Sequence, residues 1–198
     1  PPPPPPPFFF SCRSRLTSSA SVSFARRCVL ETDGTVALTT NGSGNATVVN
    51  DAALNLAAST VGGALSATAT TGNMSDSGNV TVAGTSSFTT SANNATITLN
   101  NTNALTGAVT ITTNDDSGTD ADVIIDNGTT ALILAASTID GDLSLTSGHA
   151  SGITDSGTLT VGGNLAAITD ANNGVITLDQ LAADGAVALT TNGSGNAK

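Results

Sequence analysis

The stretch LNLAASTVGGALSATATTGNMSDSGNVTVAGTSSFTT at residues 54–90 decides the fold. In its short runs apolar residues recur at every second position, as in Leu54/Leu56 and Val80/Val82, with Thr or Asn between them. A period of two residues is that of a strand with one buried face. Turn sequences such as TGN separate the runs. The stretch therefore predicts short strands joined by tight turns, with no helix of useful length.

The same alternation extends through the body of the chain. Eight pairs of apolar residues are predicted to point inward: Val36/Leu38, Leu54/Leu56, Val80/Val82, Ile97/Leu99, Val109/Ile111, Leu143/Leu145, Leu159/Val161 and Ile176/Leu178. Threonine is β-branched and suits the outward positions between them. Two continuous apolar runs, VII at 123–125 and ALILAA at 131–136, are flanked by turn residues and are strand-sized. The sequence therefore predicts an all-β body.

The body is also an internal repeat. The sequence GTVALTTNGSGNAT at 34–47 returns as GAVALTTNGSGNAK at 185–198, and a shorter copy, GAVTITT, lies at 107–113. ALNLAASTVGGALS at 53–66 returns as ALILAASTIDGDLS at 131–144, and the order of such blocks is kept. Repeats at a fixed period are typical of solenoids. We therefore expect a tandem array of units of nearly 80 residues that is truncated in its third copy.

The inward residues favour a narrow core of stacked coils. They are nearly all Val, Leu and Ile, whereas a sandwich core about 10 Å thick would use aromatic residues. Coils of ~20 residues stacked at ~4.8 Å would give about four coils per unit. The body of residues 31–198 would then form roughly eight coils and a rod ~40 Å long.

Charge divides the chain in two and excludes several partners. Residues 1–30 carry four Arg and no acid, whereas residues 31–198 carry Glu31, fourteen Asp and only Lys198 as a base. A body without Lys or Arg from 31 to 197 cannot neutralise phosphates, so we expect no nucleic-acid partner. Binding to an anionic membrane surface is disfavoured for the same reason. The chain has no run of 18 apolar residues, so we expect no membrane-inserted segment.

Residues 1–30 differ from the body in composition. They open with PPPPPPPFFF and hold both cysteines, Cys12 and Cys28. We expect a low-complexity, disordered leader, and an artefact of out-of-frame reading is the preferred explanation for it. The alternatives are a polyproline II ligand for an aromatic groove and a damaged signal peptide. The body contains no Cys and therefore no CxxC site for zinc or redox chemistry.

Two blocks carry a family resemblance: the stretch at 54–90 and ANNATITLNNTNALTGAVTITT at 92–113. They resemble the repeats of large bacterial filamentous-haemagglutinin-like exoproteins, and the resemblance covers about residues 33–197. It implies a right-handed parallel β-helix, exported through the outer membrane by a partner transporter or as an autotransporter passenger. Members serve in adhesion, biofilm formation and contact between cells. The resemblance thus implies a secreted or cell-surface protein that binds glycans or proteins of host or neighbouring cells.

The densest acidic cluster is NDDSGTDAD at 114–122. Its members Asp115, Asp116, Asp120 and Asp122 are the candidates for calcium, because hard cations prefer several carboxylate oxygens. The cluster lacks the spacing of an EF-hand loop. We therefore favour a solvated acidic turn, with a calcium site as the alternative, and expect no other cofactor.

Three functions are compatible with these observations. The first is a non-enzymatic, structural and adhesive rod whose shallow Thr, Asn and Ser faces bind weakly and multivalently. The second is a β-helical polysaccharide-degrading enzyme, because Asn114-Asp115-Asp116 and Gly148-His149-Ala150 faintly resemble polygalacturonase motifs. The body lacks the Arg and Lys that would hold a uronate, which favours the rod. The third is an open-reading-frame fragment without a function of its own.

Overall fold

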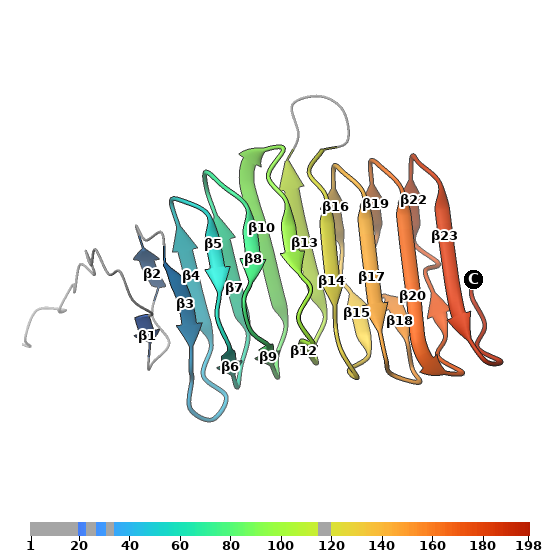
Figure 1. The fold of residues 1–198 in the computed structure, drawn as a ribbon, viewed down its shortest axis with the longest axis horizontal. Coiled ribbons are helices and arrows are strands. Elements are labelled where there is room, and N and C mark those ends of the chain that lie inside the picture. Colours follow the sequence, from blue (N-terminus) through green and yellow to red (C-terminus); the bar gives the residue numbers. More distant parts are fainter. Residues whose placement is uncertain (1–19, 23–26, 31–33, 115–119) are drawn as a thin grey trace, which may run out of the picture.

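Every element of the chain that the structure describes is a β-strand. The computed structural model describes residues 20–22, 27–30, 34–114 and 120–198. Each strand pairs with its neighbours in parallel, and the strands stack side by side along the long axis (Figure 1). The prediction of an all-β, parallel solenoid is confirmed. The described residues contain no helix that could cross a membrane.

Three parallel sheets wrap the solenoid. The first sheet has nine strands: β1 (Ala20–Val22), β3 (Thr35–Leu38), β5 (Leu54–Leu56), β8 (Met74–Asp76), β11 (Ile97–Leu99), β14 (Val123–Asp126), β17 (Leu143–Ser147), β20 (Leu165–Asn172) and β23 (Val187–Asn192). The second sheet has eleven: β2 (Arg27–Leu30), β4 (Ala46–Asn50), β7 (Leu65–Ala69), β10 (Ser86–Asn93), β13 (Val109–Asn114), β15 (Leu132–Leu134), β16 (Ser137–Ile139), β18 (Ile153–Asp155), β19 (Leu159–Val161), β21 (Ile176–Thr177) and β22 (Leu181–Ala183). The third has three: β6 (Ser59–Val61), β9 (Val80–Val82) and β12 (Ala104–Leu105).

About seven turns separate β3 from β23. From β3 to β23 the turns vary in length from 20 residues, between Leu54 and its partner Met74, to 26, between Ile97 and its partner Val123. The stack from β3 to β23 is roughly 34 Å long, because each turn adds ~4.8 Å. Four of these seven turns are longer than the expected ~20 residues.

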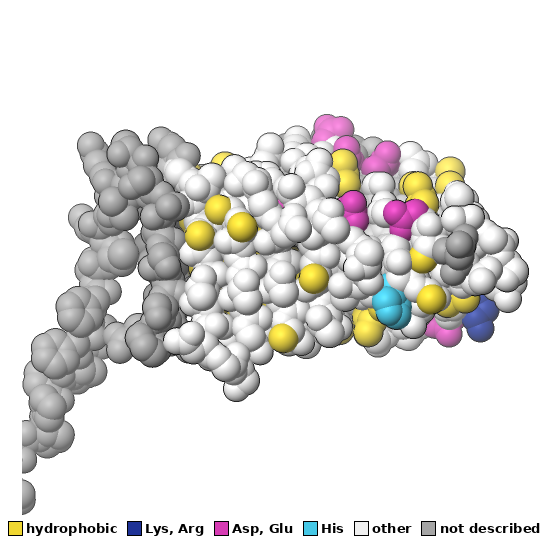
Figure 2. Space-filling model, turned by 60° about the horizontal axis from the view of Figure 1, so that its bottom comes forward, with side chains coloured by type: hydrophobic (Ala, Val, Ile, Leu, Met, Phe, Trp, Pro, Cys, Tyr) yellow, Lys and Arg dark blue, Asp and Glu magenta, His cyan; other side chains and the backbone are white. Residues whose placement is uncertain are grey.

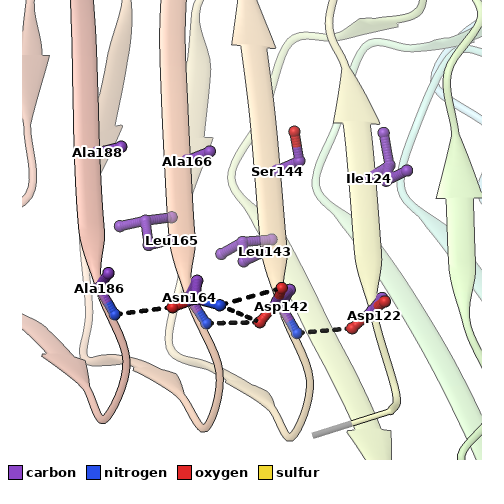
Figure 3. Close-up of a pocket in the computed structure, with 10 residues that line it drawn as sticks. All are labelled: Asp122, Ile124, Asp142, Leu143, Ser144, Asn164, Leu165, Ala166, Ala186 and Ala188. Carbon is purple, nitrogen blue, oxygen red and sulfur yellow. Dashed lines mark hydrogen bonds between the residues drawn. The ribbon is translucent and has the colours of Figure 1, made fainter.

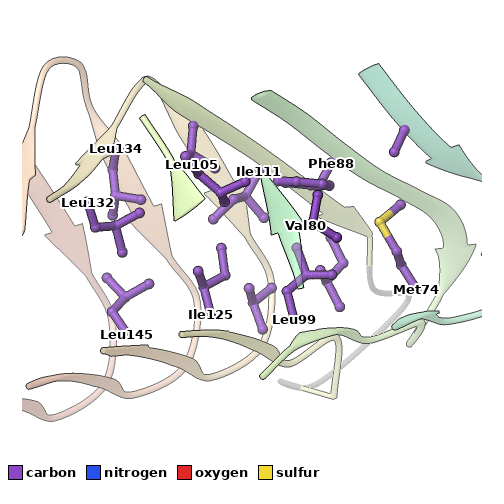
Figure 4. Packing of buried hydrophobic residues seen from close by; sticks show 14 of the residues in the cluster. Met74, Val80, Phe88, Leu99, Leu105, Ile111, Ile125, Leu132, Leu134 and Leu145 are labelled. Atoms are coloured by element: carbon purple, nitrogen blue, oxygen red, sulfur yellow. The ribbon is translucent and has the colours of Figure 1, made fainter. Parts of the chain in front are cut away.

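The core is a single column of aliphatic side chains between the sheets (Figure 4). All sixteen residues of the eight predicted inward pairs are buried. The two continuous apolar runs form β14 and β15, as their length indicated. One aromatic ring, that of Phe88 in β10, lies in this column opposite Ala67 and Ile111 of the adjacent turns. The alternation of apolar residues therefore correctly predicted these core residues.

Each sequence unit makes about three and a half turns, which the sequence did not indicate. The first unit, residues 34–106, contains β3 to β12, and the second, residues 107–184, contains β13 to β22. The repeated blocks LNL and LIL form β5 of the first sheet and β15 of the second sheet, respectively. The block DSGNVTV at 76–82 likewise forms β9 of the third sheet, whereas DSGTLTV at 155–161 forms β19 of the second. Successive units are therefore rotated by half a turn about the solenoid axis.

Figure 1 makes this rotation visible. The short strands β6, β9 and β12 lie at the bottom of the first unit, whereas their counterparts β16, β19 and β22 lie at the top of the second. The long strands β4, β7 and β10 of the first unit belong to the second sheet, whereas their counterparts β14, β17 and β20 of the second unit belong to the first. With β23 the pattern returns to the first sheet, where β3 began it.

Backbone stacks on backbone at one corner of each turn, and glycine makes this possible. Gly63, Gly84 and Gly107 follow one another in adjacent turns, and the N–H of Gly84 donates to the carbonyl oxygen of Gly63 at 2.9 Å. A Cβ atom on Gly84 would lie 2.7 Å from the carbonyl carbon and oxygen of Gly63. The corner therefore has no room for a side chain that points along the axis.

Buried polar side chains close the other corners. The Ser59 hydroxyl donates to the carbonyl of Ala57 at 2.7 Å and accepts the N–H of Leu38 at 3.0 Å. Ser137, at the equivalent place in the second unit, makes the matching pair of bonds with Ala135 and Ile111. The Ser of the repeated LAAST block is thus a corner residue that joins adjacent turns.

The predicted leader lies mostly outside the described residues. Residues 1–19 and 23–26 of the leader, with Cys12, are undescribed, as are residues 31–33 at the start of the predicted body. Within the predicted leader the structure describes two strands, β1 and β2, which pair with β3 and β4.

Candidate functional site

The outward side chains of β4, β7, β10 and β13 form an uncharged surface. Residues that face outward at one register are Thr47, Ser66, Ser87 and Thr110, and those at the next are Val49, Thr68, Thr89 and Thr112. No charged residue occurs in these four strands. We call this surface, with its extension described next, the hydroxyl face.

One threonine row of the hydroxyl face runs on past the junction between the two units. Thr112 of β13 pairs with Thr138 of β16, which pairs with Thr160 of β19. Five consecutive turns thus carry a threonine at the same register, from Thr68 to Thr160. The first two are half-buried and the last three are exposed. The row places one hydroxyl and one methyl group every ~4.8 Å along the rod.

The equivalent surface of the second unit is different in chemistry. It lies on β14, β17, β20 and β23, where an open groove of about 310 Å³ is lined at its outward row by Ile124, Ser144, Ala166 and Ala188 (Figure 3). Ile124 and, one row further on, Ile168 are each 41% exposed. Asp122 and Asp142 line one edge of the groove. We call this surface the acidic groove.

Hydrogen bonds between turns hold the edge of the acidic groove in place. The Asp122 carboxylate accepts the backbone N–H of Asp142 at 2.8 Å, and the Asp142 carboxylate accepts that of Asn164 at 2.6 Å. The side-chain oxygen of Asn164 then accepts the N–H of Ala186 at 2.9 Å. These side chains form a ladder in which each Asp or Asn accepts a backbone N–H of the next turn through a side-chain oxygen.

Acidic residues gather in the second unit. The first unit contains two Asp, Asp51 and Asp76, whereas the second contains eleven. On the face shown in Figure 2, the Asp side chains likewise lie over the second unit. Asp76 is 9% exposed, and its carboxylate accepts the side-chain N–H of Asn103 at 2.8 Å. One of the two acids of the first unit is therefore part of a corner.

The calcium candidates are only partly described. Asp115 and Asp116 lie outside the described residues, whereas Asp120 and Asp122 are both exposed just before β14. The carbonyl of Asp120 accepts the N–H of Asp122 at 3.0 Å, and the carboxylate of Asp122 belongs to the ladder above. Within residues 34–114 and 120–198, no three His, Cys, Asp or Glu side chains group around a possible metal position. The calcium site stays a prediction.

The two motifs of the enzyme hypothesis lie apart. Asn114 ends β13, which points to the top of Figure 1, whereas His149 follows β17, which belongs to the opposite sheet and runs toward the bottom. The Nδ1 atom of His149, an exposed side chain, accepts the N–H of Ser151 at 3.0 Å within a turn. The described parts of the two motifs therefore form no common site.

Fold and surfaces together define a tandem-repeat parallel β-solenoid with long, outward-facing rows of small polar side chains. Residues 43–112 and 120–192 match the family described as repeats of unknown function (DUF5649). The match covers most of the chain, so the chain belongs to this family. A search of the curated proteins and a search of the solved structures find no match.

The hydroxyl face and the acidic groove were not identified as sites from the sequence. Thr, Ser and Asn faces were expected, but not which threonines share a register across turns of unequal length. One signal was available in the aligned repeats. Ser87 and Thr110 correspond, one repeat further along the chain, to Ala166 and Ala188, which shows that the outward rows differ while the core is kept.

Proposed function

We propose that this chain is a repeat segment of a secreted or surface-exposed bacterial exoprotein that acts as a stiff, non-enzymatic, adhesive rod. The five-turn threonine row of the hydroxyl face is the observation that carries this proposal. The resemblance of the repeats to those of filamentous-haemagglutinin-like exoproteins supports the location at the cell surface. Export would then use an outer-membrane transporter.

The hydroxyl face suits a long, uncharged, polyhydroxylated partner. Each Thr or Ser hydroxyl offers one donor and two acceptor positions, and the rows repeat them at ~4.8 Å. A glycan chain of a host or neighbouring cell could meet equivalent hydroxyl groups turn after turn. A single such contact is weak because both partners exchange hydrogen bonds with water. Repetition along one rod, and between rods, converts weak contacts into avidity.

Binding of the full chain to immobilised cell-surface glycans tests the adhesive role. We expect binding by a multivalent display of the chain and a loss of about tenfold or more in avidity for Thr89→Val/Thr112→Val. Valine keeps the shape and the β-branch, and Val49 already occupies this row. The matched control is Thr60→Val/Thr81→Val, which removes two paired hydroxyls from the third sheet.

Two results would contradict the adhesive role. One is the absence of glycan or cell binding by the multivalent wild-type chain. The other is an equal loss of binding in both double variants, since this would show that the hydroxyl face is not the contact surface. Accessibility of the native protein to protease on intact source cells tests its exposure separately. Full protection would contradict the cell-surface location.

A further inference from the structure

The acidic groove combines a carboxylate edge with an apolar surface. Its outward row changes from Ile124 through Ser144 to Ala166 and Ala188, and the groove holds about 310 Å³. Ile124 and Ile168 add exposed apolar side chains to the alanines of this surface, and a contiguous exposed apolar patch marks an interaction site. Figure 3 shows Asp122 and Asp142 side by side along one edge, next to this surface. A ligand would therefore meet negative charge at one side and apolar contact at the other.

The surface carries further carboxylates and has no neighbouring base in the sequence. Asp126 lies in the second outward row, at the register of Thr146 and Ile168, and Asp170 is exposed further along β20. The chain has no Lys or Arg from residue 31 to residue 197. The acidic groove is thus complementary to a cation that another molecule must supply.

The first unit shows that the solenoid does not need these charges. Asn45 takes the place of Asp122, because its side-chain oxygen accepts the N–H of Ala64 at 2.8 Å just as Asp122 accepts that of Asp142. Ala64 correspondingly takes the place of Asp142. In the outward rows, Thr47 and Thr89 stand where the second unit has Ile124 and Ile168. The acidic edge and the isoleucines are therefore additions to a surface that folds without them.

We propose that the acidic groove binds an extended basic peptide segment of a partner protein. Lysine or arginine heads would lie at Asp122 and Asp142, and their aliphatic stems would cover Ala166 and Ala188. Aliphatic side chains of the same segment would cover Ile124 and Ile168. Nucleic acids and anionic lipids carry the wrong charge for this edge. This partner is distinct in class and position from the glycan of the hydroxyl face.

Fluorescence anisotropy with a short synthetic peptide of alternating Lys and Leu tests the proposal on the full chain. We expect saturable binding that weakens as salt rises from ~0.01 M to ~0.15 M, because exposed charges are screened. Asp122→Asn/Asp142→Asn should weaken binding by about tenfold or more. Asn preserves the ladder, as Asn45 and Asn164 already do.

The matched control is Asp51→Asn/Asp179→Asn, which removes the same charge from two exposed positions outside the groove. It should leave the affinity within about twofold. Equal weakening by both double variants would overturn the proposal, because it would show a diffuse attraction to an acidic protein. Failure of the wild-type chain to bind would overturn it as well.

The apolar half of the groove has its own test. Ile124→Thr/Ile168→Thr installs the residues of the first unit and should weaken the Lys–Leu peptide several-fold. It should leave a peptide of alternating Lys and Ser nearly unaffected. An unchanged affinity for the Lys–Leu peptide would overturn the apolar contact. Circular dichroism of each variant confirms that the solenoid is intact.

Discussion

A single buried asparagine can close a corner of this solenoid. Asn127 is fully buried, and its side-chain oxygen accepts the N–H of Leu105 in the preceding turn at 2.8 Å. Its amide group donates to the carbonyls of Leu105, Thr130 and Ala131 at 2.9 to 3.2 Å. Corner backbone groups that cannot join a strand ladder thereby find partners. Asparagine suits this place because it offers donors and an acceptor without a charge.

Asn127→Ala should lower the free energy of unfolding by about 1–3 kcal/mol, because it leaves buried backbone groups without partners. Urea unfolding of the full chain measures the loss. The control is Asn73→Ala, which removes an exposed bond to the N–H of Thr96 and should cost about 0.5 kcal/mol. Equal losses in the two variants would contradict the corner role of Asn127.

Gly84→Ala should also destabilise the solenoid, by about 1–3 kcal/mol, because the new methyl group meets the backbone of Gly63. The adjacent control Ala83→Ser changes an exposed residue and should stay within about 0.5 kcal/mol. Thermal and urea unfolding of both variants check this expectation. An unperturbed Gly84→Ala would mean that the turns are not stacked backbone on backbone at this corner.

At the scale of the strands, equivalent inward positions of adjacent turns contribute side chains of different volume to the core. Inward positions at one register change in volume from turn to turn, as in the series Ala67, Phe88 and Ile111. The ring of Phe88 is fully buried, and its partner in the preceding turn, Ala67, is small enough to leave room for it. In the second unit the small residue Ala167 occupies the place of Phe88. The two units therefore adopt the same fold with different core side chains.

Phe88→Ala should cost about 3–5 kcal/mol of unfolding free energy, because it opens a cavity between adjacent turns. Phe88→Leu should cost less than about 1.5 kcal/mol, since it keeps most of the volume. Denaturant titrations followed by circular dichroism separate the two. A small loss in Phe88→Ala would show that neighbouring turns collapse onto the vacated space.

The strands were largely predictable from the sequence, whereas their lateral neighbours were not. Alternation fixes which face of a strand is buried, so the spacing of pairs such as Leu54/Leu56 and Val80/Val82 was enough to place them inside. Register between turns depends on the number of residues at each corner, and that number varies. The threonine row and the acidic groove exist only through register, which explains why neither could be predicted as a site. The acidic cluster, by contrast, stood out by composition alone, but its loop residues 115–119 lie outside the described residues.

At the scale of the whole molecule, each unit makes about three and a half turns. The extra half turn determines on which side of the rod the surface of the next unit lies. The first unit presents its long strands on the second sheet, and the second unit presents its own on the first. The hydroxyl face and the acidic groove therefore lie on opposite sheets. The two proposed partners, an uncharged glycan and a basic peptide, would therefore bind on opposite sides of the rod.

Deletion of residues 107–184, which joins Thr106 to Gly185, should move β23 from the first sheet to the second. β23 would then take the place of β13, and Ala188 would become the neighbour of Ser87. With Cys12 and Cys28 replaced by Ser, cysteines at positions 87 and 188 should cross-link through a short thiol reagent in the shortened chain. They should not cross-link in the full chain.

A different cross-link would contradict this expectation. Cysteines at positions 98 and 188 of the shortened chain report on the first sheet, because Thr98 faces outward on β11. Efficient linkage of that pair, and none between positions 87 and 188, would mean that β23 keeps its sheet after the deletion. The half-turn would then not be a property of the unit itself.

The half-turn also bears on how a gene for such an array can change. Recombination between repeats adds or removes whole copies, and every odd change in copy number rotates all downstream surfaces to the other side of the rod. An even change restores them. Parity of copy number, and not length alone, would then decide whether two distant patches on one solenoid face the same side. Selection on such arrays should therefore act on repeats in pairs.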